Sequence, residues 1–137
     1  MEMKLVRLFF RKSQRIVLRE DFDRVLSGKC FVCKGVLRLY VTANDRDMPR
    51  FGVSVSKTCG GATTRNRLKR FGREAFRLHQ HEIPPNFDYI LIITQKKPKK
   101  AEKNNKISKE SHPVMRFQDV ENAFLTMIQA LSRKMDR

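Results

Sequence analysis

The pattern of apolar and polar residues along the chain predicts a mixed α/β domain. From residue 35 to 43, and again from 51 to 56, apolar side chains recur at every second position, which is the period of a strand buried on one face. Residues 88 to 94 are almost continuously apolar, which predicts a central strand buried on both faces. Three further segments have the three- and four-residue spacing of amphipathic helices: residues 20–28, 65–78 and 117–131.

The connections between these segments predict how the strands pair. Segment 44–49 contains Asn, Asp and Pro, so we expect a turn that joins strand 35–43 antiparallel to strand 51–56. Helix 65–78 lies between strands 51–56 and 88–94. This order is a β-α-β unit, which predicts that these two strands are parallel neighbours.

The helix between residues 65 and 78 has two contrasting faces, and Thr63 or Thr64 is its predicted N-cap. At about 100° per residue, Phe76 falls between the two faces. The apolar arc contains Leu68, Phe71, Gly72, Ala75 and Leu78. The opposite arc is cationic, with Arg67 at its margin: Arg65, Lys69, Arg70, Arg73 and Arg77. Because like charges four residues apart repel, this face predicts a polyanionic partner rather than a merely solvated surface.

Two further segments are polar and basic. Residues 1–14 predict a flexible basic arm, followed by one domain at residues 15–135 that begins to pack through Ile16 and Leu18. Segment 95–113 carries seven lysines against two glutamates, which predicts a mobile, lysine-rich loop within that domain.

The overall charge strengthens the expectation of an anionic partner. The 137 residues include 30 Lys and Arg against 14 Asp and Glu, a net charge of +16, which favours nucleic acid over an anionic membrane. No apolar run approaches the roughly 20 residues of a membrane span, and the N-terminus is too interrupted by charge for a secretory signal. Three cysteines, an odd number, indicate a reducing compartment, so we expect a cytoplasmic protein.

The sequence contains no recognisable catalytic or metal motif. Cys30 and Cys33 form a C-x-x-C, but only Cys59 and three unpaired histidines remain to complete a zinc site, so we interpret the cysteines as small apolar residues. His79 and His81 are two residues apart and diverge on a helix. Phosphate-binding loops, nucleophile elbows and clusters of carboxylates are missing. We therefore predict no catalytic residue and no metal ligand.

One segment resembles a known family. It contains V-S-V-S-K at residues 53–57, Gly60-Gly61, R-N-R-L-K-R at residues 65–70 and R-E-A-F-R at residues 73–77. This order resembles the protein subunit of bacterial ribonuclease P, and weaker similarities extend from about residue 15 to 131. The resemblance implies an α+β fold, a two-layer sandwich of the ribosomal-S5-like type. It also implies a mostly antiparallel central sheet with a left-handed β-α-β crossover, against the general right-handed rule.

The resemblance also implies a function. Ribonuclease P is an endoribonuclease that removes the 5′ leader of precursor tRNA; in bacteria its RNA subunit performs the chemistry with Mg²⁺. The protein is then an accessory subunit without an active site or bound cofactor. Its expected partners are ribonuclease P RNA and precursor tRNA, with no membrane and no need for a protein oligomer. The alternative is a non-catalytic RNA-binding protein of another ribonucleoprotein, such as a ribosomal protein, with DNA binding and a stand-alone nuclease as weaker options.

The resemblance assigns two sets of residues. The first matches the motif that binds the RNA subunit: Arg65, Asn66, Arg67, Lys69, Arg70 and Arg73. The second falls in the cleft between the first helix and the sheet, where the leader is expected: Phe22, Arg38, Tyr40, Ser54, Ser56 and Lys57. Leu26 stands where many members have a second aromatic residue, and Thr58 where a second lysine is common. Burial of Phe22 in the core, or of Tyr40 beneath the helix, is the competing interpretation.

Overall fold

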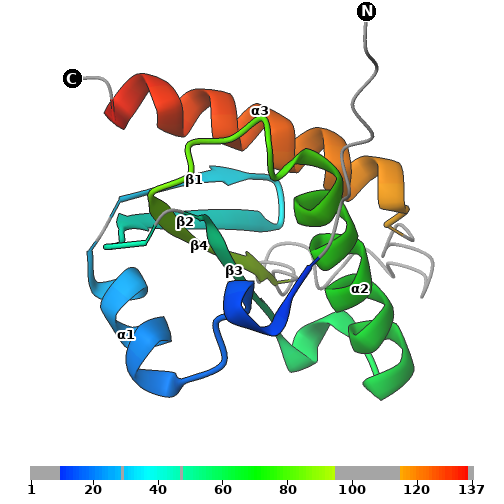
Figure 1. Cartoon of the computed structure of the whole chain (residues 1–137). Helices are drawn as coiled ribbons and strands as arrows, with labels where there is room; N and C mark the ends of the chain where they lie inside the picture. The colour runs from blue at the N-terminus through cyan, green and yellow to red at the C-terminus, as the bar shows by residue number, and fades with distance from the viewer. Residues whose placement is uncertain (1–9, 29, 47, 95–114, 136–137) are drawn as a thin grey trace, which may run out of the picture.

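The computed structural model describes residues 10–28, 30–46, 48–94 and 115–135, and Figure 1 shows their arrangement. In chain order the elements are α1 (Arg19–Ser27), β1 (Phe31–Lys34), β2 (Leu37–Ala43), β3 (Arg50–Val55), α2 (Ala62–His79), β4 (Phe87–Ile93) and α3 (Phe117–Met135). Two short 3-10 helices, η1 (Lys12–Gln14) and η2 (Lys57–Cys59), precede α1 and α2. The N-terminal residues 1–9 and the whole of the predicted lysine-rich loop, residues 95–113, lie outside the described residues.

The four strands form one sheet in the order β1-β2-β4-β3. Strand β2 pairs antiparallel with both β1 and β4, and β3 pairs parallel with β4. The predicted α+β class, the mostly antiparallel sheet and the parallel pairing of β3 with β4 are confirmed. The predicted pairing of β2 with β3 across their turn is wrong, because β4 lies between them. Ile90 and Leu91, on opposite faces of β4, are both fully buried, so β4 takes the centre of the sheet.

The helices cover the two faces of the sheet unequally (Figure 1). Helices α2 and α3 pack against each other and against one face, where they enclose the main core. Helix α1 packs on the opposite face, mainly over β2 and β4. Beneath it lies a second, smaller core of Ile16, Val25 and Ile90. Part of this second face is therefore not covered by a helix.

Helix α2 lies very close to the sheet. Its predicted apolar stripe is confirmed, with Leu68 and Ala75 buried. Gly72 faces the strands, and a Cβ atom at this position would lie 3.2 Å from Leu91 Cδ2 and 3.3 Å from Val53 Cγ2. The missing side chain thus permits the close approach of helix and sheet.

Aromatic packing begins earlier in the chain than predicted. The ring of Phe10 lies 6.2 Å from that of Phe51 and 5.4 Å from that of Phe76, so the packed structure starts before the predicted boundary at residue 15. Phe76, predicted between the two faces of α2, is fully buried because Phe10 and the sheet enclose it. Ile16 is buried as predicted, whereas Leu18 is 61% exposed and does not anchor the arm.

Candidate RNA-binding surfaces

Helix α2 begins about one turn before the first residue of the basic motif. Its N-cap is Gly61, and Ala62 is its first residue, so the predicted caps Thr63 and Thr64 already lie within the first turn. Gly60 has a φ of +135°, a conformation that side chains rarely adopt, and it turns the chain from η2 into α2. All six residues that match the RNA-subunit motif therefore lie within regular helix.

These six residues have few interaction partners among the described residues of the protein. The exposed members are Asn66, Arg67, Arg70 and Arg73, and the half-buried members are Arg65 and Lys69. None of them forms an ion pair within the described residues. Arg77 differs, because it pairs with Glu74 one turn earlier in the helix. The basic face of α2 is thus charged along the motif and neutralised only beyond it.

Arg65 carries a polar atom that lacks a partner. Its Nε is buried, and no group in the described residues accepts its hydrogen. A buried donor without an acceptor costs free energy, and an oxygen from a bound molecule would satisfy it. Together with the neighbouring exposed cations, this donor fits a surface that is completed by a polyanion.

Strand register brings together part of the second predicted set. Ile92 of β4 pairs with Arg38 on one side and with Ser54 on the other, so these three residues form a row across the sheet. Residues opposite each other on paired strands point to the same face. Arg38 and Ser54 are exposed and Ile92 is half-buried. We call this row the open strip, because its outer members Arg38 and Ser54 are exposed.

The next row lies beneath α1. Ile90 pairs with Tyr40 and with Gly52 and is fully buried. Phe22 of α1 packs against this row, and its Cζ would lie 2.9 Å from a Cβ atom at Gly52. Phe22 and Tyr40 are both half-buried members of the small core under α1. Both therefore contribute to packing while keeping an exposed edge beside the open strip.

The last two residues of the second set lie just beyond β3. Ser56 is the N-cap of η2, and its hydroxyl accepts a hydrogen bond from the backbone N–H of Thr58. Lys57 is exposed at the first position of η2. The structure therefore gives Ser56 a capping role, which its position in the V-S-V-S-K motif did not predict.

Sequence reasoning missed one residue of this surface. Phe31 of β1 pairs with Tyr40 of β2, and their rings stack with centroids 4.8 Å apart. Strand β1 itself was not predicted, because its four residues, Phe31–Lys34, show no alternation of apolar and polar side chains. Only the strand register reveals that Phe31 stands beside the open strip.

A buried carboxylate fixes α1 to the sheet. Asp88 of β4 is fully buried and accepts hydrogen bonds from Arg24 of α1 and from Arg50 of β3, whose Nε lies 2.9 Å from Asp88 Oδ1. Asn44 Nδ2 donates to the same oxygen at 2.7 Å. Burial alone would raise the pKa of Asp88, but the hydrogen bonds from Arg50, Asn44 and Arg24 outweigh it and lower the pKa. This network holds one wall of the surface in place.

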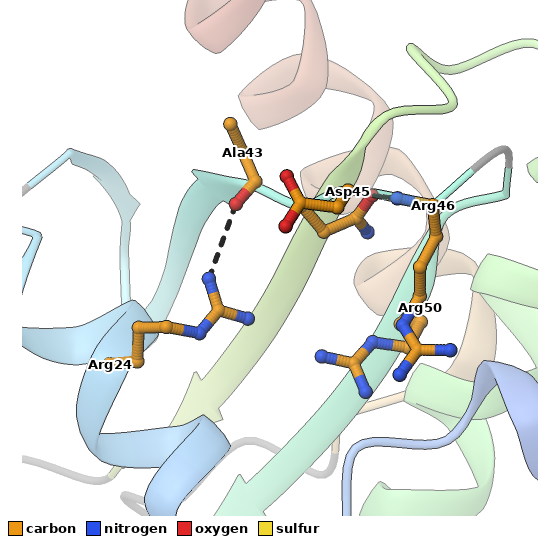
Figure 2. A pocket seen from close by; sticks show the side chains of 6 residues that line it. Arg24, Ala43, Asp45, Arg46 and Arg50 are labelled. Atoms are coloured by element: carbon orange, nitrogen blue, oxygen red, sulfur yellow. Dashed lines mark hydrogen bonds between the residues drawn. The ribbon is translucent and has the colours of Figure 1, made fainter.

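A pocket of about 450 Å³ opens beside this network (Figure 2). It is lined by six residues, of which three are arginines and one is acidic: Arg24, Ala43, Asn44, Asp45, Arg46 and Arg50. Figure 2 shows that Arg24 reaches from α1 toward the end of β2, where it donates to the carbonyl oxygen of Ala43. Arg24 and Arg50 are already paired with Asp88, so these two arginines are engaged by the fold itself. We interpret the pocket as structural.

The cysteines do not form a centre. Cys30 and Cys59 are half-buried against the main core, as predicted for small apolar residues, whereas Cys33 is exposed. Within the described residues, no group of three or more His, Cys, Asp or Glu side chains is arranged to hold a metal ion. Among the same residues, no helix is both long and apolar enough to cross a membrane.

Comparison with known proteins identifies similar chains. Residues 10–116 match the family model described as Ribonuclease P. A ribonuclease P protein component from Macrococcus caseolyticus is 36% identical over 107 residues, which are 77% of this chain and 90% of the relative. A second, from Clostridioides difficile, is 40% identical over 85 residues, 61% of this chain and 74% of the relative.

Solved structures agree with the sequence relatives. The ribonuclease P protein of Staphylococcus aureus superposes with a TM-score of 0.67 at 27% identity, covering 87% of this chain and 95% of that one. The protein from Thermotoga maritima gives a TM-score of 0.64 at 28% identity, covering 85% and 96%. The matches support this family and not another ribonucleoprotein.

Proposed function

This chain belongs to the ribonuclease P protein family, the accessory subunit of the holoenzyme that cleaves tRNA precursors, and we propose that its two surfaces divide the work of binding RNA. The basic face of α2 binds the catalytic RNA subunit. The open strip and the exposed edges of Phe22 and Tyr40 guide the 5′ leader of precursor tRNA.

The observation that carries the first assignment is the row of unpaired cations on α2. Arg67, Arg70 and Arg73 are exposed and form no ion pair within the part of the chain that the structure describes. A guanidinium presents a planar fork of N–H donors that matches two phosphate oxygens. The buried Nε of Arg65 would gain an acceptor from the same RNA. Helix α2 would then be stabilised by the phosphates that neutralise it.

The second assignment rests on the chemistry of the open strip. Arg38 and Ser54 supply exposed donors, and the half-buried side chains beside them supply apolar and aromatic surface. Unpaired bases stack on aromatic rings with little sequence preference, and cations follow the backbone. Such a strip suits leaders of many different sequences.

The chemistry of cleavage belongs, in this proposal, to the RNA subunit. The family resemblance assigns Mg²⁺ to that subunit, and we assign no catalytic role to a side chain of this protein. The protein then contributes affinity and orientation for substrate. A cytoplasmic location is part of the same proposal.

The experiment that tests this function is cleavage of a precursor tRNA at low Mg²⁺ by the cognate RNA subunit, with and without the protein. We expect strong stimulation by the protein and no cleavage by the protein alone. Absence of stimulation while the protein still binds the RNA would contradict the proposal. Cleavage without the RNA subunit would show that the protein has an active site of its own.

A further inference from the structure

A cluster of two aromatic rings and one arginine joins the edge of the sheet to the open strip. Phe31 stacks on Tyr40 at an interplanar angle of 29°. The guanidinium carbon of Arg38 lies 5.3 Å from the centre of the Phe31 ring, and its Nη1 donates to the Tyr40 hydroxyl at 3.2 Å. Three side chains from two strands thus form one connected group.

This cluster restrains an arginine that would otherwise be mobile. Arg38 is exposed, and a free arginine side chain loses much rotamer entropy when it binds. Here the Tyr40 hydroxyl and the Phe31 ring hold the guanidinium, and hydrogen bonding with Tyr40 and Cys33 raises the pKa of Arg38. A guanidinium has five N–H donors, so several remain for another molecule.

The surroundings of Arg38 favour a phosphate as that molecule. The residues paired across this row and the next one carry no carboxylate: Cys33, Arg38, Ile92 and Ser54, and Phe31, Tyr40, Ile90 and Gly52. The nearest buried carboxylate, Asp88, is already occupied by Arg24 and Arg50. Arg38 is therefore a restrained cation without an opposing charge in its own row.

We propose that Phe31 is a positioning residue for leader recognition, which holds Arg38 where it binds a leader phosphate at the edge of the sheet. This inference rests on the proposed function of the open strip. Helix α2, where we place the RNA subunit, contacts β3. A leader that extends from that side therefore meets the sheet at β3 and reaches Phe31 only after it crosses to β1. Three strand spacings separate β3 from β1, roughly 14 Å. Long leaders gain this contact, and a leader of a single nucleotide does not.

The test measures the affinity of the reconstituted holoenzyme for two precursor tRNAs, one with a long leader and one with a single leader nucleotide. Phe31→Leu keeps an apolar side chain in β1 but removes the ring beneath Arg38, and we expect about three- to tenfold weaker binding of the long leader. Phe31→Tyr restores the ring and should bind like the original protein. Neither variant should change affinity for the short leader.

Arg38→Ala supplies the matched comparison. It should weaken binding of the long leader by about tenfold and reduce the slope of log affinity against log salt by about 0.7, the value for one phosphate on a single strand. The double variant Phe31→Leu with Arg38→Ala should bind no more weakly than Arg38→Ala alone, because Phe31 acts through Arg38.

The outcomes separate this inference from the proposed function. Two outcomes would overturn the positioning role of Phe31 and leave the assignment of the open strip intact. One is an additive loss of affinity in the double variant. The other is unchanged affinity in Phe31→Leu while Arg38→Ala binds the long leader more weakly. Equal losses for the long and short leaders would make Phe31 a purely structural residue. If Arg38→Ala leaves leader-dependent affinity unchanged, the assignment of the open strip itself fails.

Discussion

The molecule carries two groups of arginines, which differ in whether a carboxylate of the protein pairs with them. Arg24 and Arg50 share one buried carboxylate, that of Asp88. Arg67 and Arg73 on α2 are exposed and form no ion pair within the described residues. Composition does not separate the two groups, because both belong to the same strongly basic chain. Their partners do: a paired guanidinium stabilises the fold, and an unpaired one is available to RNA.

The comparison has an energetic consequence. Removing one partner of a buried ion pair costs about 3–5 kcal/mol, because the other charge stays buried without compensation. Substitution of an exposed, unpaired arginine changes stability by no more than about 0.5 kcal/mol. The first group should therefore control the free energy of unfolding, and the second should control affinity for RNA.

The largest expected effect comes from Asp88→Asn. The Arg50 side chain is only 9% exposed, and this substitution leaves its charge with only the more distant carboxylate of Asp21, at 3.6 Å. We expect the free energy of unfolding to fall by about 3–5 kcal/mol. Urea denaturation of the protein, followed by circular dichroism, measures this change.

Asp45→Asn is the control for that substitution, since Asp45 is an exposed carboxylate lining the pocket next to the same network. We expect it to change the free energy of unfolding by no more than about 0.5 kcal/mol.

The pKa of Asp88 is lowered in the folded state. Its contribution is therefore complete above the ordinary aspartate pKa of about 3.9 and is lost as the pH falls further. Equal stability of the two variants would contradict the structural role of Asp88.

The second prediction concerns Arg67→Ala. Because Arg67 is exposed and unpaired within the described residues, its removal should leave the free energy of unfolding almost unchanged. Affinity for the RNA subunit should fall by about 1.5–3 kcal/mol, and the salt slope by about 0.7–0.9. Binding titrations at several salt concentrations measure both quantities.

Arg46→Ala removes the same charge from the turn between β2 and β3, where Arg46 is also exposed. It should weaken binding of the RNA subunit much less than Arg67→Ala. Equal weakening by the two variants would mean that net charge, rather than the face of α2, determines binding.

Residue periodicity predicted the three helices, strands β2, β3 and β4, and the basic face, because these depend on the spacing of residues close together in the sequence. The stripe of α2 and the double-sided burial of β4 follow from the spacing of apolar residues alone. The pairing of β2 with β4 did not follow, because a turn between β2 and β3 indicates direction but not which strand lies between them. The full burial of Phe76 was missed for a similar reason, since Phe10 covers it from a distant part of the chain.

Prediction of the second surface requires the strand register, which the pattern of apolar and polar residues does not give. The family resemblance selected Arg38 and Tyr40, but it did not select Phe31, which stacks on Tyr40 from a strand that the sequence did not predict. The partners of an arginine are equally hidden in a sequence: nothing local to Arg24 or Arg50 indicates that both meet Asp88. Which cations are free for RNA is therefore a property of the fold.

A third kind of cation, whose charge depends on pH, sharpens the comparison. His79 lies at the end of α2, with Nε2 2.8 Å from Glu121 Oε2 of α3 and Nδ1 3.1 Å from Glu82 Oε2. Burial alone would lower the pKa of His79, but hydrogen bonds with Glu121 and Glu82 outweigh it and raise the pKa above 6.5. At low pH, His79 is therefore a paired cation like the arginines of the first group. At high pH, its side chain is uncharged.

The stability from His79 should be the smallest of the three effects. A raised pKa means that this stability is fully present below the unfolded-state pKa of about 6.5 and is lost as the pH rises through the folded-state pKa. Since Glu82 is 66% exposed, we expect a loss below about 1 kcal/mol between about pH 6 and pH 9. Urea denaturation at both pH values should show this loss, and His79→Gln should abolish it. His81→Gln, at an exposed histidine two residues away, should retain it. If His79→Gln kept the full pH dependence, the bridge between α2 and α3 would not be an ion pair, and His79 would belong with neither group of cations.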